Sequence, residues 1–323
     1  MSFAWAITSE NKLRKTWRDA DAYSASTEAT GYPKENAVDG NPESEWRASA
    51  SPANIILDTG DAAPDYDYIV LRFDYSKLPT AVNIQTCDTA GGVYAEIANN
   101  YDGDIDTTLS AAADRASRII SVGSSTNFEI GNTVTLNDGV ETTKKYIVVN
   151  KGTGWLELDR YPEPYAIAAS VTLLPDWNIL AHIAAGEQKR YIKIIVTATT
   201  PHLLEAYAFD VRYTFDGNAL PLNPMPVAEA REVGNITRSF SNYGIGAMHT
   251  GPNFSRYTLQ MGKMGMEANA IIAWLERQDR FGILMDDGRW IECMLQGNIT
   301  RARRPSADGE LISYAAQITV EEV

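Results

Sequence analysis

Cysteine is scarce in this chain of 323 residues, and long apolar runs are missing. The two cysteines, Cys87 and Cys293, lie far apart, so the sequence supports neither a disulfide framework nor a cysteine-and-histidine spacing for zinc. No run reaches the roughly 18 apolar residues of a transmembrane helix, so membrane insertion is not expected. The first residues lack the basic and apolar regions of a signal peptide, which predicts synthesis and folding in a reducing cytosol.

Positive charge is also scarce. The chain has 28 Lys and Arg residues and 42 Asp and Glu residues, which gives a net charge of −14. A nucleic-acid surface needs clustered positive charge, so a nucleic-acid partner is excluded. The short basic run at residues 301–304 is predicted to be a solvated turn. Residues 217–323 hold 10 basic and 12 acidic residues, net −2, so the chain before them carries −12.

Catalytic motifs are missing as well. None of the three histidines, His182, His202 and His249, lies in a glycine-rich nucleophile turn, and each is predicted to be an ordinary surface or core residue. The sequence contains no phosphate-binding glycine loop, and its many carboxylates show no specific pairing for glycoside hydrolysis. We therefore assign no catalytic residue and do not expect an enzyme.

The stretch NAVDGNPESEW, residues 36–46, is dense in features that build a site. Its Asp-Gly and Asn-Pro pairs are turn dipeptides, and its oxygen atoms can converge on a hard cation, which takes about six to eight of them. Trp46 follows as an anchor for a hydrophobic core. A strand is expected soon after, at residues 54–58.

This order resembles the discoidin family, also called the coagulation-factor C-type domain, and its carbohydrate-binding-module relatives. The family pattern Asn-Ala-x-Asp-Gly-Asn-x-x-Thr-x-Trp is kept throughout, except that Ser44 replaces Thr. Residues 189–196 and 209–213 resemble the family's late Arg-Tyr-Ile strand and its closing strand. The resemblance covers residues 5–100 and 176–216 and implies a jelly-roll β-sandwich.

The resemblance also implies a structural Ca²⁺ ion. Its implied ligands are the backbone of Asn36 or Ala37 and the side chains of Asp39, Asn41, Ser44 and Asp210. Asp210 stands where the family usually has Glu and is shorter by one methylene. In the alternative interpretation, Asp39 caps the turn and binds no metal.

Carbohydrate-binding relatives hold sugars on loops at one end of the sandwich, by aromatic stacking and hydrogen bonds. The implied candidates here are Tyr32, Arg47 and Tyr101, whereas Trp46 is assigned to the core.

The gap in the resemblance is expected to be an inserted domain. Residues 104–174 show five short strand patterns separated by turn signals, which predicts a small β-barrel. The barrel would interrupt a sandwich made of residues 1–103 and 175–216. The predicted barrel strands are residues 118–122, 133–136, 145–149, 155–158 and 170–174.

Residues 217–235 are rich in proline and predict a linker, and residues 236–323 predict a further β module. That module is expected to hold strands, a hairpin at an Asp-Asp-Gly turn and one amphipathic helix at residues 264–278. With Trp274, the run at 280–284 and Trp290, it resembles the tube-and-ring module of distal and minor tail proteins of tailed bacteriophages.

The sequence as a whole therefore predicts a mainly β, non-enzymatic structural component of a bacteriophage tail tip or baseplate. The resemblance implies a homo-oligomeric ring, a hexamer or a trimer, with other tail proteins and host surface glycans as partners. It would be assembled in the host cytoplasm and located in the virion. The alternative is a stand-alone carbohydrate-binding protein or adhesin, for which the tail-like module would have no use.

Overall fold

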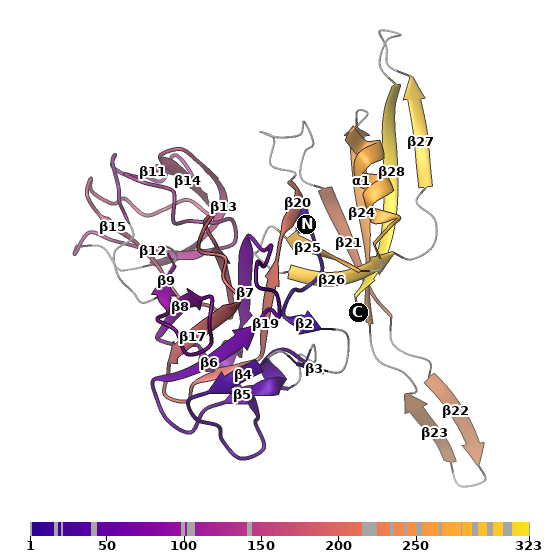
Figure 1. Ribbon diagram of the computed structural model, residues 1–323. Coiled ribbons are helices and arrows are strands. Elements are labelled where there is room, and N and C mark those ends of the chain that lie inside the picture. The colour runs from indigo at the N-terminus through magenta and orange to yellow at the C-terminus, as the bar shows by residue number, and fades with distance from the viewer. Residues whose placement is uncertain are drawn as a thin grey trace. The chain divides into compact units, whose positions relative to one another are not determined.

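The computed structural model shows a mainly β protein that divides into two compact units (Figure 1). We call residues 11–211 the sandwich unit, and residues 1–10, 212–285 and 290–323 the terminal unit. No helix within the described part of the chain is long and apolar enough to cross a membrane. The structure describes residues 2–15, 19–20, 22–39, 44–97, 101, 107–140, 144–214, 225–232, 236–241, 244–249, 254–264, 267–278, 280–285, 290–295, 300–305 and 312–322.

The sandwich unit contains two antiparallel sheets that share one hydrophobic core. The five-stranded sheet has the order β4 (Ala22–Ala25), β6 (Ala53–Asp58), β17 (Tyr191–Thr197), β8 (Ala81–Cys87), β9 (Ala95–Glu96). The three-stranded sheet has the order β16 (Asn178–His182), β7 (Tyr68–Arg72), β19 (Glu205–Phe209). The smaller pairs are β2 (Arg14–Lys15) with β3 (Asp19–Ala20), and β5 (Trp46–Arg47) with β18 (His202–Leu203). Two short 3-10 helices also belong to this unit, η1 (Lys34–Ala37) and η2 (Tyr75–Lys77).

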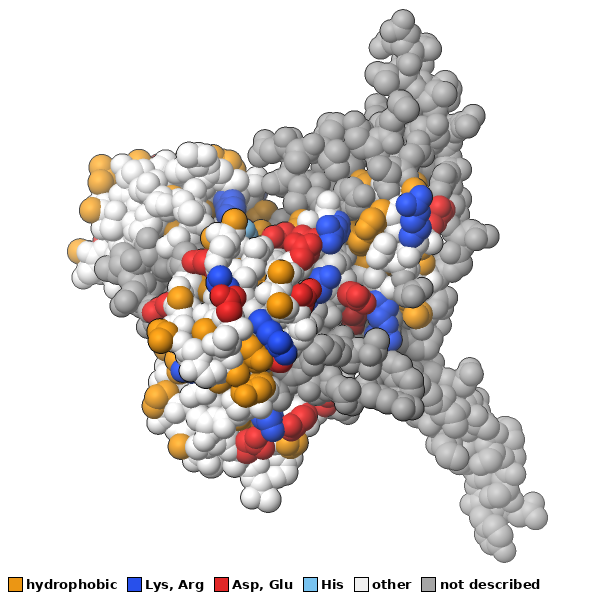
Figure 2. Space-filling view, viewed as in Figure 1, with side chains coloured by type: hydrophobic (Ala, Val, Ile, Leu, Met, Phe, Trp, Pro, Cys, Tyr) orange, Lys and Arg blue, Asp and Glu red, His pale blue; other side chains and the backbone are white. Residues whose placement is uncertain are grey.

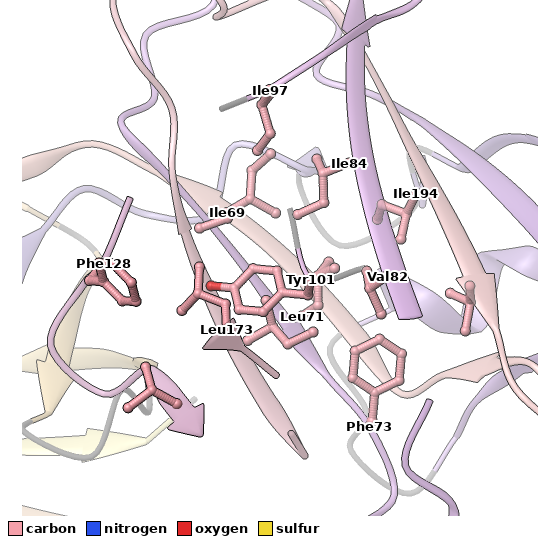
Figure 3. Packing of buried hydrophobic residues seen from close by; sticks show 14 of the residues in the cluster. Ile69, Leu71, Phe73, Val82, Ile84, Ile97, Tyr101, Phe128, Leu173 and Ile194 are labelled. Atoms are coloured by element: carbon pink, nitrogen blue, oxygen red, sulfur yellow. The ribbon is translucent and has the colours of Figure 1, made fainter. Parts of the chain in front are cut away.

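This core forms because side chains along β6, β8 and β17 alternate between a buried face and a more exposed face. On β6 the even-numbered side chains are half-buried and the odd-numbered ones are buried, as a strand with one face on a core requires. β17 and β8 alternate in the same way. Figure 3 shows Ile69 and Leu71 of β7 facing Val82 and Ile84 of β8 across the space between the sheets. The predicted jelly-roll sandwich is confirmed by this arrangement.

Six strands between β9 and β16 form a second, closed sheet. Its order is β10 (Thr107–Thr108), β15 (Ser170–Leu173), β12 (Thr133–Asn137), β13 (Lys144–Gly152), β14 (Trp155–Leu158), β11 (Ile119–Ser121). Leu109 forms a bridge with Val122, and Gly123 N–H donates to the Thr108 carbonyl at 2.9 Å, so the first and last strands meet. The sheet is therefore a small barrel.

The barrel is joined to the sandwich through a buried polar contact. The Asn132 side-chain amide donates to the Leu180 carbonyl at 3.0 Å and to the Tyr101 hydroxyl at 3.2 Å. The Tyr101 hydroxyl in turn donates to the same carbonyl at 2.6 Å. Figure 3 shows the Tyr101 ring among the apolar side chains of the shared core. The buried Asn132 amide has these two bonds only when barrel and sandwich are both in place.

The terminal unit is built on an eight-stranded antiparallel sheet. β1 pairs with both β21 and β25, so the sheet returns on itself. Within the described residues, the α-helix of this unit is α1 (Glu267–Leu275). The sheet order is β20 (Val211–Thr214), β1 (Ser2–Thr8), β21 (Met225–Glu232), β24 (Phe254–Met264), β28 (Ile312–Glu322), β26 (Trp290–Leu295), β25 (Phe281–Met285), with β27 (Thr300–Pro305) paired to β28.

Trp290 of β26 packs closely against β1 and β25 of this sheet. The Trp290 indole N–H donates to the Thr8 hydroxyl at 2.7 Å, and both residues are buried. A Cβ built on Gly282 would lie 2.0 Å from the indole nitrogen, so the ring occupies the space that any other residue would need. The expected helix begins three residues later than predicted, because β24 runs through Met264.

The order of the domains differs from the prediction. Residues 1–10 were expected in the sandwich, but β1 lies in the terminal sheet next to β20. Residues 209–213 were expected as the closing strand of the sandwich, but β19 is its last strand and β20 begins the terminal unit. The chain thus leaves the terminal unit after β1 and returns at β20. Alternating patterns show that a segment is a strand, but not which sheet it joins.

Two further segments are corrected. Residues 225–232, placed in the predicted linker, form β21, which pairs with β1 and β24; residues 215–224 lie outside the described part. The basic run at 301–304 is no turn, because it lies in β27 and pairs with β28. The hairpin of β22 (Ile236–Ser241) and β23 (Gly244–His249) was not predicted. Its sequence is rich in glycine and serine and lacks a strong apolar alternation.

We expect the barrel to be dispensable for folding of the sandwich. Replacing residues 104–174 by a Gly/Ser linker should give a soluble protein that unfolds cooperatively but at a lower temperature. The reason is that Tyr101 still bonds to the Leu180 carbonyl, whereas the Asn132 contact is lost. Scanning calorimetry measures this.

As a control, deletion of residues 133–158 alone removes β12, β13 and β14 and leaves unpaired barrel strands, so this variant should aggregate. An insoluble 104–174 replacement would contradict an autonomous insert.

Candidate functional site

The motif at residues 36–46 forms a loop whose two ends are joined by a hydrogen bond. The Asn36 side-chain amide donates to the Glu45 carbonyl at 3.0 Å, which joins the end of η1 to the start of β5. The Ser44 hydroxyl donates to an Asp39 carboxylate oxygen at 2.8 Å. Trp46 is fully buried, as predicted, and anchors the loop in the core. Residues 40–43 lie outside the described part.

The predicted cation ligands are only partly brought together. Asp39 and Ser44 are in contact, Ala37 is buried at the end of η1, and Asn41 is among the residues not described. Asp210 is buried after β19, where its neighbours bond to Asp67. Within the described residues, no three or more His, Cys, Asp or Glu side chains are grouped to hold a metal ion.

The contact between Asp39 and Ser44 is the part of the candidate cation site that the described residues support directly. Trp46, at the end of the motif, pairs with Leu203 of β18 in antiparallel fashion. Asp210 follows the end of β19.

Two predicted glycan-binding residues do come together. The Arg47 guanidinium carbon lies 3.8 Å from the centroid of the Tyr32 ring, a cation–π contact. Ala29 N–H donates to the Arg47 carbonyl at 2.7 Å, which holds the loop before η1 against β5. The same guanidinium forms an ion pair with the buried Glu45 carboxylate. Loop and strand thus present a ring, a cation and an anion side by side.

The short helix η2 adds a second pair of charges. Asp74 caps it, since a carboxylate oxygen accepts from Ser76 N–H at 2.9 Å. Hydrogen bonds from Ser76, followed by the contact with Lys77, hold the pKa of Asp74 well below its usual range. The Lys77 ammonium lies 3.1 Å from Asp74 and 4.0 Å from Glu45, so it links η2 to the segment just before β5. Tyr75 projects from the turn and is 77% exposed.

His202 lies buried beneath these groups. It pairs in register with Arg47, and its Nε2 accepts from Asp74 N–H at 3.0 Å. Its Nδ1 is 3.3 Å from the Thr200 carbonyl, to which it donates in the neutral ring. Burial lowers the pKa of His202, which favours this neutral form. We call Tyr32, Glu45, Arg47, Asp74, Tyr75, Lys77 and His202 the loop-end cluster.

Two buried polar atoms of the cluster lack a hydrogen-bond partner among the described residues, namely Glu45 Oε2 and Arg47 Nε. One is an acceptor and the other a donor, and they belong to side chains two residues apart, Glu45 just before β5 and Arg47 within it. A hydroxyl group can donate to the first and accept from the second. An anion or a cation can satisfy only one of them.

Charge in the cluster is balanced. Glu45 and Asp74 stand against Arg47 and Lys77, and each ion pair joins opposite signs. On the face shown in Figure 2, acidic and basic side chains are likewise interspersed among hydrophobic ones. Such a surface gives no strong field to attract a polyanion or a polycation.

The third predicted glycan-binding residue is corrected. Tyr101 is 1% exposed, and its hydroxyl bonds to the Leu180 carbonyl. A ring enclosed in the core offers no face to a sugar. Sequence reasoning missed Asp74, Tyr75 and Lys77, although the Asp-x-Ser cap of η2 marks a turn that exposes the residue between them.

Matches to known proteins are confined to solved structures, because no family model and no curated protein matches the chain. SpGH29 aligns over 63% of this chain and 28% of its own, with 15% identity and a TM-score of 0.29. The family 32 carbohydrate-binding module of AlyQ, in complex with 4,5-unsaturated mannuronic acid, aligns over 58% of this chain and 92% of its own, with 15% identity and a TM-score of 0.27.

A third structure is module CBM32-1 from a family 31 glycoside hydrolase of Clostridium perfringens. It aligns over 61% of this chain and 100% of its own, with 11% identity and a TM-score of 0.26. Because all three scores are low, the sandwich is assigned from its own strand pairing.

Proposed function

We propose that the sandwich unit binds a neutral carbohydrate at the loop-end cluster, without catalysis. The observation that carries the proposal is the pair of unpartnered atoms, Glu45 Oε2 and Arg47 Nε. The two side chains form an ion pair through their other atoms, but a buried polar atom without a hydrogen bond costs free energy, and a ligand hydroxyl that bonds to both atoms would remove that cost.

The surroundings fit the same class of ligand. Tyr75 exposes an aromatic ring on which the apolar face of a pyranose can stack. Glu45 and Asp74 disfavour an anionic sugar, and Arg47 and Lys77 disfavour a cationic one. A neutral, hydroxyl-rich ring is the ligand that meets balanced charges without leaving one of them unpaired.

We further propose that the protein is a structural component of a bacteriophage tail tip or baseplate, located in the virion. The terminal unit supports this by its construction. Within the described part, the β22–β23 hairpin pairs only with itself, so both of its outer edges are left without a strand partner there. Such edges can pair with neighbouring copies in a ring or with other tail proteins. A stand-alone carbohydrate-binding protein is the second candidate, because the loop-end cluster alone would suffice for it.

We also propose a structural Ca²⁺ ion in the motif loop. The Asp39 carboxylate and Ser44 hydroxyl supply hard oxygen donors in contact with each other, and the Ala37 carbonyl and Asn41 would complete the set. The ion would stiffen the loop that precedes Glu45 and Arg47, and so support the binding site.

Glu45→Gln should lower the affinity for a neutral glycan about tenfold or more, because it removes a charged hydrogen-bond acceptor. Tyr75→Ala should lower it several-fold and leave the fold intact, since the ring is exposed. Glycan arrays followed by calorimetry measure both effects. Tyr161→Ala is the matched control, because Tyr161 is 60% exposed but lies in the barrel, and it should bind like the wild type. Absence of binding to any neutral glycan would refute the proposal.

Calcium should raise the melting temperature of the wild type but not of Asp39→Ala, because an ion bound to the native state stabilises it by mass action. At a concentration about 100 times Kd, the gain is ~2.7 kcal/mol, or several degrees. Asp61→Ala, an exposed loop carboxylate elsewhere in the unit, is the control and should respond like the wild type. Coincident melting curves in calcium and in chelator would remove the ion.

The chain of 323 residues should form an oligomer, with a mass near three or six times 35.5 kDa by light scattering. Residues 217–323 have a net charge of only −2, so packing around an axis meets little repulsion. The oligomer should persist at high salt, because screening weakens repulsion between the acidic sandwich units. A monomer at high concentration would favour the stand-alone carbohydrate-binding protein.

A further inference from the structure

His202 connects two loops that are far apart in the sequence. Its Nε2 accepts from Asp74 N–H at 3.0 Å, and its Nδ1 faces the Thr200 carbonyl at 3.3 Å. The ring is 1% exposed, so water has little access to replace either bond. One side chain thus attaches the turn that carries Tyr75 and Lys77 to the strand opposite Arg47.

The two bonds specify one protonation state. The Thr200 carbonyl requires a proton on Nδ1, and Asp74 N–H requires a lone pair on Nε2. Only the neutral ring with its proton on Nδ1 supplies both. A second proton would have to occupy Nε2, where it would face the Asp74 N–H donor.

We propose that His202 is a positioning residue that makes ligand binding at the loop-end cluster dependent on pH: the neutral ring holds η2 in its binding position, and protonation releases it. This inference rests on the proposed carbohydrate-binding function. The role of His202 is indirect, because the ring lies under the cluster and acts through residues 74–77.

Several groups face the ring from the elements packed on it. Glu45 and Asp74 favour the imidazolium, Lys77 disfavours it, and the Thr200 carbonyl favours a proton. Phe73 presents its ring to His202 at right angles, with centroids 5.8 Å apart, and gives a cation no hydrogen bond. Arg47, paired in register, adds a second positive charge. Burial is the largest effect and lowers the pKa.

Release would be confined to η2. The chain before it is held independently, since Phe73 N–H donates to the Trp177 carbonyl at 2.7 Å and Leu204 N–H to the Arg72 carbonyl at 2.9 Å. The Asp74 cap lies within the turn, and the Lys77 ammonium reaches Glu45, just before β5, at 4.0 Å. Loss of the His202 bond therefore frees Tyr75 and Lys77 without unfolding the sandwich.

The direction of the pH effect follows from the lowered pKa. In the released turn the ring is hydrated and titrates near its ordinary pKa of about 6.5. In the attached turn its pKa is lower, so proton uptake favours release. The attached form is fully favoured above about pH 6.5 and is progressively lost as the pH falls below that value.

The test measures glycan affinity between pH 7.5 and 5.0, where carboxylates with ordinary pKa values of about 4 remain mostly ionised. Wild-type affinity should fall about tenfold or more across it. His202→Gln should give a flat profile whatever its absolute affinity, because the Gln carbonyl accepts from Asp74 N–H and does not titrate. His182→Gln is the matched control; His182 contacts Tyr68 on β7, and this variant should keep the wild-type profile.

Hydrogen exchange at the Asp74 amide supplies a readout that needs no glycan. Corrected for the intrinsic pH dependence, its protection should fall at least tenfold at pH 5.0 in the wild type and stay constant in His202→Gln. A wild type that binds glycan equally at both pH values, with Asp74 still protected, overturns the inference but leaves the proposed function. A parallel fall in His202→Gln also overturns it. If no glycan binds at any pH, the proposed function fails, and the Asp74 amide decides the role of His202 alone.

Discussion

The position of β17 between β6 and β8 is the constraint on which the sandwich unit depends. Residues 191–197 pair on one side with 53–58 and on the other with 81–87, so the sheet is complete only when late and early segments meet. The chain between β8 and β17 must therefore leave the sheet and return to it, and the barrel is inserted in this connection. The chain that follows β17 reaches the motif loop through the pairing of β18 with β5. A short strand pair thus joins the 200–203 segment to Arg47.

The chain contains two insertions, the sandwich unit within the terminal unit and the barrel within the sandwich, and both follow one rule. An inserted unit is tolerated where its two ends leave and re-enter neighbouring positions, because the host then keeps its own pairing. The sandwich unit meets this condition at β1 and β20, which are adjacent in the terminal sheet. The barrel meets it at Tyr101 and Leu180, which are joined by a hydrogen bond. Where the barrel joins the sandwich, the buried Asn132 side chain bonds to Leu180, and barrel and sandwich share one hydrophobic core.

The loop-end cluster shows how a neutral site can be built from charged residues. Each cation has an acidic partner, yet the ion pairs leave Glu45 Oε2 and Arg47 Nε without a hydrogen-bond partner among the described residues. The backbone places these groups: β5 carries Arg47, the Asn36 amide bonds to the carbonyl of Glu45 just before it, and the Asp74 cap holds η2. His202 completes the frame beneath them, which explains why a histidine without catalytic surroundings is buried with both ring nitrogens engaged.

Local sequence was enough to predict many of the strands and turns of the sandwich and the barrel, but not β21, β27 or the β22–β23 hairpin. Alternation at 54–58 and 133–136, glycine turns at 139 and 154, and the burial of Trp46 all follow from local pattern, because each depends on a residue and its near neighbours. Pairing partners are not local. Only the tertiary structure shows that β1 and β20 join the terminal sheet, and that Tyr101 is buried while Tyr75 is exposed. It also shows that His202 bonds to Asp74, 128 residues away in the sequence. The reason is that burial and contact depend on which distant strands share a sheet.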